Sequence, residues 1–97
     1  MHNTITECEV EQEILLVFID KLKCNKDILQ TENYQKPLTW EPFYFSVIDM
    51  AYLFFEVEKQ FSIKIPEQFL HEYGFSTIEQ IINTVNNLVS DNLSNIE

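Results

Sequence analysis

Three segments of this chain carry apolar residues every three or four positions, which is the spacing of one face of an α-helix. In the middle segment such residues lie at offsets 0, 3, 4, 7 and 11, at Met50, Leu53, Phe54, Val57 and Phe61. The 97 residues include a single glycine, which leaves little of the turn chemistry that an all-β sandwich or barrel needs. We therefore predict one all-α domain spanning residues 1–97.

Four helices are predicted, three long and one short, over residues 7–23, 46–61, 67–72 and 77–90. Pro66 suits the start of the short third helix, and Gly74 suits its end, where a left-handed residue is favoured. Residues 62–65 alternate isoleucine with polar residues but have no partner strand elsewhere in the sequence, so we expect an extended link there. Residues 91–97 are expected to fray. The expected architecture is a four-helix bundle.

Each long helix is preceded by a side chain that can accept hydrogen bonds from its first turn. The predicted capping boxes pair Thr6 with Glu9, Ser76 with Glu79 and, in a weaker form, Ser46 with Asp49. The core is expected to hold apolar side chains from all the helices and the link: Val10, Ile14, Phe18, Leu53, Phe54, Val57, Phe61, Ile65, Ile82 and Val85. The long connection at 24–42 is expected to pack its isolated apolar residues onto the bundle, with a short helical turn at 26–30.

The charge of the chain is strongly one-sided. Sixteen acidic residues accompany six basic ones, all of them lysines, for a formal net charge of −10. Nucleic acids and anionic membranes bind cationic surfaces, so neither is an expected partner. A protein partner with a basic patch is favoured, because the acidic field would speed that encounter.

The targeting and redox signals of the sequence are weak. The longest apolar run, residues 14–19, is far shorter than the about 20 residues that a membrane span needs, and the first residues lack the basic region of a signal peptide. We therefore expect a cytoplasmic protein in which Cys8 and Cys24 are free thiols, although a disulfide between them stays open. A zinc site is not expected, because no second Cys pair or His pair has the required spacing.

A known pattern appears in the second helix and the link that follows it. The run Phe54-Phe55-Glu56-Val57-Glu58-Lys59-Gln60-Phe61-Ser62-Ile63-Lys64-Ile65-Pro66 resembles acyl carrier proteins, in which an apolar and acidic helix ends in E-x-x-F and an alternating link closes with I-P. Ser76-Thr77-Ile78 resembles the T-T-V that starts the last helix of that family. The resemblance covers about residues 47–86 and implies a four-helix acyl-carrier-like bundle with a small third helix.

The family's cofactor motif is not intact in this chain. Acyl carrier proteins attach 4′-phosphopantetheine to the serine of a D-S-L motif at the start of the second helix. A count without gaps places Val47 at that serine, while Ser46 lies one residue earlier and follows Phe45 instead of Asp. One residue rotates a helical side chain by about 100°. Ser46 is therefore either a helix N-cap or the phosphopantetheine site, and we expect no cofactor unless Ser46 is modified.

The second helix also carries an apolar stripe beside its core face. The stripe and its acidic neighbours comprise Ile48, Ala51, Tyr52, Phe55, Glu56 and Glu58. By the resemblance, carrier proteins dock partner enzymes on this face, and a large exposed apolar stripe generally marks an interface. The alternative is that residues 38–45 cover the stripe with Trp40, Phe43, Tyr44 and Phe45. Both interpretations stay open at this point.

Catalytic and metal chemistry find little support in the sequence. His71 is expected at the surface, and no nucleophile elbow or second metal-spaced histidine accompanies it. We therefore expect neither an enzyme nor a metal site. The resulting hypothesis is a non-enzymatic acyl-carrier-related protein, acting through its second helix as a docking or accessory subunit of a biosynthetic or peptide-maturation system. The alternative is an acyl or aminoacyl carrier with 4′-phosphopantetheine on Ser46.

Overall fold

The structure, a computed structural model, describes residues 7–94, with side chains described over residues 9–89. Its elements are helical, with no strand in the described range: α1 (Glu7–Asp20), η1 (Lys26–Ile28), η2 (Thr31–Asn33), α2 (Val47–Phe61), α3 (Glu67–Tyr73) and α4 (Ile78–Ser94). Three long helices and one short helix confirm the predicted all-α class.

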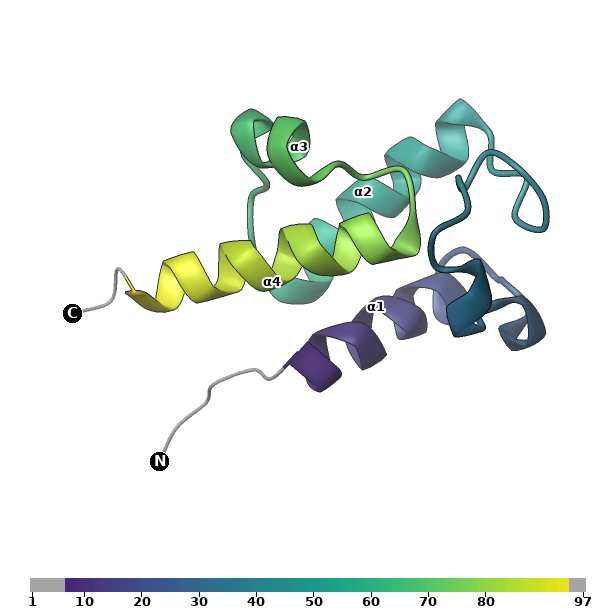
Figure 1. Ribbon diagram of the computed structural model, residues 1–97, viewed down its shortest axis with the longest axis horizontal. Helices are drawn as coiled ribbons and strands as arrows, with labels where there is room; N and C mark the ends of the chain where they lie inside the picture. The colour runs from purple at the N-terminus through teal and green to yellow at the C-terminus, as the bar shows by residue number, and fades with distance from the viewer. Residues whose placement is uncertain (1–6, 95–97) are drawn as a thin grey trace.

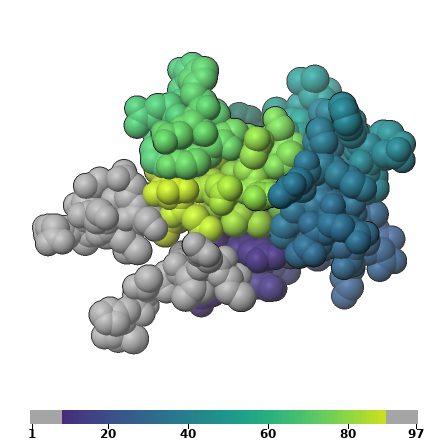
Figure 2. All heavy atoms as spheres, in the orientation of Figure 1, coloured from purple at the N-terminus to yellow at the C-terminus, as the bar shows by residue number. Residues whose placement is uncertain are grey.

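The helices pack around α1 and α4. α1 contacts both α2 and α4, while α3 contacts α4. α1 and α4 run in opposite directions, so the described start of α1 and the end of α4 lie at the same end of the molecule (Figure 1). The connection from α1 to α2 covers the opposite end, where it forms most of the surface seen in Figure 2.

The core joins these helices to the connection. Its buried apolar side chains are Val10, Ile14, Val17, Phe18, Leu29, Leu38, Phe43, Phe45, Leu53, Val57, Ile65, Ile78, Ile81, Val85 and Leu88. Three predicted core residues, Phe54, Phe61 and Ile82, are only half-buried and pack against the edge of this cluster. Phe54 lies at the margin because its ring meets Phe75, with centroids 5.3 Å apart, instead of entering the centre.

Two of the long helices end at residues other than those predicted. α1 ends at Asp20 rather than residue 23, because Lys23 adopts a left-handed φ of 60° and the Cys24 amide donates to the Phe18 carbonyl at 2.9 Å. This hydrogen bond joins residues six positions apart, one more than in a Schellman cap, and the left-handed turn is made here without glycine. α4 continues to Ser94, four residues beyond the predicted end, and residues 95–97 lie outside the described range.

Gly74 follows the end of α3 as predicted, although the helix ends at Tyr73, one residue later than predicted. Gly74 follows its last residue with φ 84°, and the Gly74 amide donates to the Leu70 carbonyl at 2.9 Å. A β-carbon at this position would lie 2.7 Å from the Gln80 side chain. The positive φ therefore favours glycine here, and a β-carbon would also push the end of the flexible Gln80 side chain aside.

The predicted capping boxes have different outcomes. The box of Ser46 and Asp49 is present with both hydrogen bonds. The box at Ser76 and Glu79 is wrong by one residue: Thr77 Oγ1 accepts from the Gln80 amide at 3.1 Å, and Gln80 Oε1 accepts from the Ser76 amide at 2.8 Å. The box predicted at Thr6 lies outside the described residues.

The connection between α1 and α2 is anchored by aromatic rings and by backbone hydrogen bonds. Phe43 and Phe45 are buried on Phe18, with ring centroids 6.5 and 5.8 Å from the Phe18 ring. The Phe45 amide donates to the Leu38 carbonyl, and the Leu38 amide donates to the Ser76 carbonyl, each at 2.9 Å. The connection is thus an ordered part of the core, as expected from its isolated apolar residues.

Candidate docking face on the second helix

Ser46 is exposed and stands as the N-cap of α2. Its Oγ accepts from the Asp49 amide at 3.0 Å, and the Asp49 carboxylate accepts from the Ser46 amide at 2.9 Å. Val47, the position that a count without gaps assigns to the modified serine, is the first helical residue and is 84% exposed. The N-cap interpretation of Ser46 is therefore confirmed, while the attachment of a cofactor remains a proposal.

The apolar stripe of α2 faces solvent. Ile48 is 79%, Tyr52 44% and Phe55 61% exposed, and Ala51 between them is also exposed. Their spacing of four and three residues puts them on one side of the helix, away from buried Leu53. The alternative, that residues 38–45 cover this stripe, is wrong because Phe43 and Phe45 turn into the core instead.

The two carboxylates predicted to flank the stripe are already engaged. The prediction that Glu56 lies on the docking face is wrong. Glu56 is 7% exposed and cannot act as a surface acid, because it shares the core side of α2 with Leu53 and Val57. Its carboxylate lies 3.5 Å from the Lys59 ammonium. Glu58 is half-buried, and its Oε2 accepts from the Ile65 amide at 2.8 Å, which fixes the link to α3.

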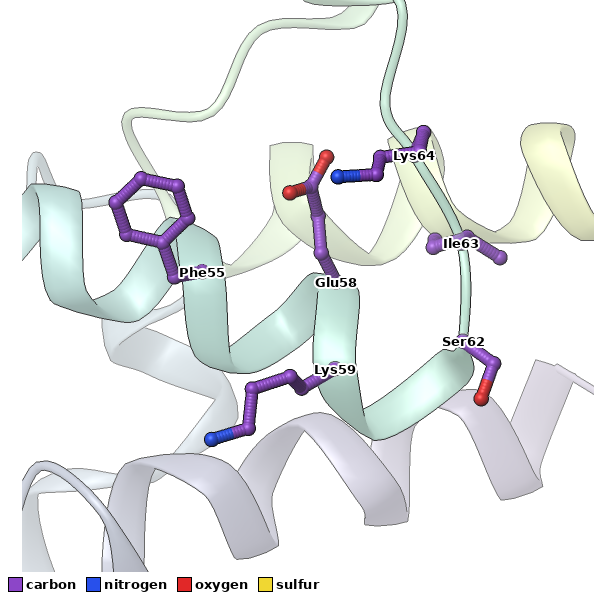
Figure 3. Close-up of a pocket in the computed structure, with 6 residues that line it drawn as sticks. All are labelled: Phe55, Glu58, Lys59, Ser62, Ile63 and Lys64. Atoms are coloured by element: carbon purple, nitrogen blue, oxygen red, sulfur yellow. The ribbon is translucent and has the colours of Figure 1, made fainter.

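A shallow hollow continues the stripe beyond Phe55. It is lined by Phe55, Glu58, Lys59, Ser62, Ile63 and Lys64 (Figure 3). The Lys64 side chain extends toward the Glu58 carboxylate, whereas Lys59 extends toward a different side of α2. Ser62 closes the helix in a left-handed conformation and turns the chain so that Ile63 lies beside this hollow.

Sequence reasoning missed three exposed apolar side chains near the start of α2. Val47 was not assigned to the stripe, and Trp40 and Tyr44, expected to serve as cover, are 66% and 70% exposed. The sequence did contain a signal for the exposure of Tyr44. Tyr44 lies between Phe43 and Phe45, and when both of these rings turn into the core, the side chain between them turns outward. The backbone at Tyr44 adopts a left-handed φ of 54° at this point.

The thiol near this end of α2 is not activated. Cys24 is a free, half-buried cysteine. Burial, with a smaller contribution from the negative charge of Asp49, raises the pKa of the Cys24 thiol. The protonated thiol is a poor nucleophile, so this residue gives no support to covalent chemistry.

Metal sites, membrane spans and relatives place few constraints on the function of this chain. Within the described part of the chain, no group of three His, Cys, Asp or Glu side chains is arranged to hold a metal ion. None of the described helices is long and apolar enough to cross a membrane. No family model, curated protein or solved structure matches this chain.

Proposed function

We propose that this chain is a non-enzymatic, acyl-carrier-related interaction module that docks a protein partner on the solvent face of α2. The observation that carries the proposal is the exposed stripe of Val47, Ile48, Ala51, Tyr52 and Phe55. Scattered single apolar residues are normal at a protein surface, but several on one helix face are typical of an interface. An amphipathic partner could bury such anchors at helical spacing.

The charge of the chain supports a basic partner. The formal net charge of −10 would attract a cationic surface over several ångströms and orient it before contact. Glu56 and Glu58 are held within the fold, so the attraction comes from the field of the whole chain instead of an acidic pair beside the stripe. The apolar stripe would then supply the short-range contact, and the charge would mainly speed association.

The resemblance to acyl carrier proteins suggests the kind of system in which this chain works. The chain would be an accessory subunit of a biosynthetic or peptide-maturation system, where carrier-type domains bind enzymes. In this proposal the chain carries no reactive group of its own. Its contribution is to recruit or position the partner through α2.

One observation favours the alternative of a working carrier. Ser46 is exposed at the start of α2, and the cap uses its Oγ only as a hydrogen-bond acceptor. An Oγ esterified to phosphopantetheine would keep that oxygen in place. The cofactor would then supply the thiol that carries an acyl or aminoacyl group.

Photo-crosslinking in the source cells tests the docking face. A Tyr52→p-benzoylphenylalanine variant should capture one partner, identified by mass spectrometry, whereas Glu72→p-benzoylphenylalanine on exposed α3 should not. The purified partner should bind the wild-type chain and lose binding to Phe55→Asp, because a charge on a desolvated apolar contact is costly. Equal capture from positions 52 and 72 would contradict the proposal.

A further inference from the structure

A second hollow lies away from the α2 stripe, between η1 and residues 35–42. Ile28, Pro37 and Pro42 give it apolar walls, and Trp40 lines it while keeping 66% of its surface exposed. Trp40 is the only tryptophan of the chain. Tryptophan and arginine are the residues most enriched among the strongest contributors to protein interfaces.

The backbone holds Trp40 in place without a partner. The Trp40 amide donates to the Pro37 carbonyl at 3.0 Å, and the Trp40 carbonyl accepts from the amides of Phe43 and Tyr44 at 2.9 Å. Phe43 is buried on Phe18, so this turn is tied to the core. The backbone that carries Trp40 is therefore preorganised, which lowers the entropy lost when a partner binds there.

The charges of this hollow favour a cation. Asp27 and Glu41 line it, and both residues are exposed. Within the described residues neither carboxylate has a hydrogen bond or an ion pair. Lys36 also lines the hollow and opposes a cation, which leaves one net negative charge there in a chain of net charge −10.

An arginine side chain matches this set of groups better than other side chains do. Its planar guanidinium can stack on the face of an indole and still donate hydrogen bonds to carboxylates at its edge. Its three methylene groups suit walls of isoleucine and proline. A lysine ammonium is a more strongly hydrated point charge and would not use the flat indole face as well.

We propose that the hollow at Trp40 receives an arginine side chain of the docking partner. The proposal rests on the proposed docking function and deepens it, because it names the partner chemistry at a point outside the α2 stripe. The partner would then contact the chain at two places, through apolar side chains on α2 and through one arginine at Trp40.

A nuclear magnetic resonance titration tests the hollow directly, because the single tryptophan gives a single indole N–H signal. The probe is acetyl-Gly-Arg-Gly-amide, added to about 20 mM, well above a dissociation constant of about 1 mM. The control peptide replaces arginine with citrulline, which keeps the shape of the side chain without its charge. The arginine peptide should shift the indole signal and the amide signals of Asp27 and Glu41 in a saturable way, and the citrulline peptide should not.

Variants that change one charge each test how the side chains of the hollow contribute to binding of the arginine peptide. Glu41→Gln and Asp27→Asn should each weaken probe binding about two- to fivefold, and Lys36→Gln should tighten it about twofold. Glu72→Gln, which changes the net charge by the same amount on distant α3, should leave binding unchanged. Equal effects of Glu41→Gln and Glu72→Gln, or equal responses to both peptides, would overturn the inference. If the wild-type chain gives no probe response but still crosslinks a partner at position 52, the hollow alone is refuted. If it gives the probe response but crosslinks no partner at position 52, the docking face is refuted.

Discussion

Ser46 and Asp49 exchange two hydrogen bonds across the first turn of α2. The Ser46 hydroxyl accepts from the Asp49 amide at 3.0 Å, and the Asp49 carboxylate accepts from the Ser46 amide at 2.9 Å. Each bond satisfies an amide that the helix itself leaves unpaired. The residue with the strongest claim to carry a cofactor therefore already has a structural role.

Incubation with coenzyme A and a promiscuous phosphopantetheinyl transferase should leave the chain unmodified. The chain contains no D-S-L sequence, and Ser46 is preceded by Phe45 instead of Asp. Intact-mass spectrometry is the measurement, since attachment would add about 340 Da as a covalent modification. A complete mass increase that disappears in Ser46→Ala would establish the carrier alternative instead.

Phe55→Asp should keep the fold of the wild-type chain. The Phe55 side chain is 61% exposed, so the new carboxylate stays in water. Loss of the ring contact with Phe54, together with the low helix propensity of Asp, should lower the free energy of unfolding by no more than about 1–2 kcal/mol. Leu53→Asp is the matched control on the same helix: Leu53 is fully buried, and an unpaired charge there should unfold the domain. Thermal melts followed by circular dichroism compare the two. A melt of Phe55→Asp as low as that of Leu53→Asp would mean that Phe55 belongs to the core.

Tyr44→Gly should not destabilise the protein, although it removes an aromatic side chain. Tyr44 is 70% exposed and adopts a left-handed φ of 54°, a conformation that costs about 1–2 kcal/mol for an L-residue with a β-carbon. Glycine removes that strain but adds freedom to the unfolded chain, so the free energy of unfolding should be unchanged or up to about 1 kcal/mol higher. Urea denaturation measures it.

The neighbouring variant Phe45→Ala serves as the contrast for Tyr44→Gly. The Phe45 ring is buried and stacks on Phe18 with centroids 5.8 Å apart, so its loss should cost about 3–5 kcal/mol. If Tyr44→Gly were destabilised to a similar extent, the outward orientation of Tyr44 would be refuted.

Alkaline pH should reveal the contact between Tyr34 and Glu11. The Tyr34 hydroxyl donates to the Glu11 carboxylate at 2.6 Å, and burial, this hydrogen bond and the Glu11 charge together raise the pKa of Tyr34. A raised pKa favours the neutral phenol in the folded state, so its contribution to stability is complete below about pH 10 and is lost as the pH rises through the folded pKa.

Tyr34→Phe isolates that contribution from the other titrating groups. At pH 7 the variant should be less stable by about 1–2 kcal/mol, because it loses a hydrogen bond to a charged group. The difference between the two proteins should shrink above about pH 10. Urea denaturation at pH 7, 9 and 11 measures it, and a difference that is constant with pH would contradict the coupling.

Thr77→Ala should cost about 1 kcal/mol, whereas Ser76→Ala should cost clearly less. Thr77 Oγ1 accepts from the Gln80 amide at the start of α4, while Ser76 contributes its backbone amide, which any residue supplies. Chemical denaturation of both variants decides between the two caps. A larger loss for Ser76→Ala would place the cap where the sequence pattern alone puts it.

The helices themselves could be predicted from local chemistry. The spacing of Met50, Leu53 and Val57 defines the buried side of α2, because helical geometry alone brings such residues together. Gly74 ends α3 and Ser46 begins α2 for equally local reasons, since φ and short-range hydrogen bonds decide both. At Ser76 and Thr77 two adjacent residues could each cap α4, and the sequence pattern predicted the cap one residue too early.

Tertiary packing decided which apolar residues are covered. Periodicity does not distinguish half-buried Phe54 from buried Val57, and composition does not distinguish buried Phe43 from exposed Tyr44. Burial depends on what the rest of the chain brings to each surface. Phe18 on α1 offers a place for Phe43 and Phe45, which lie about 25 residues further along the chain.

The candidate docking face likewise depends partly on the sequence and partly on the tertiary packing. The sequence by itself determined the all-α class, the acidic charge, and an apolar stripe with two competing explanations. Only the tertiary structure decided that the connection folds into the core at Phe45 instead of over Phe55, because an aromatic ring gains more by joining a closed cluster than by covering an open helix face. The exposed stripe and the hollow at Trp40 are both consequences of that choice.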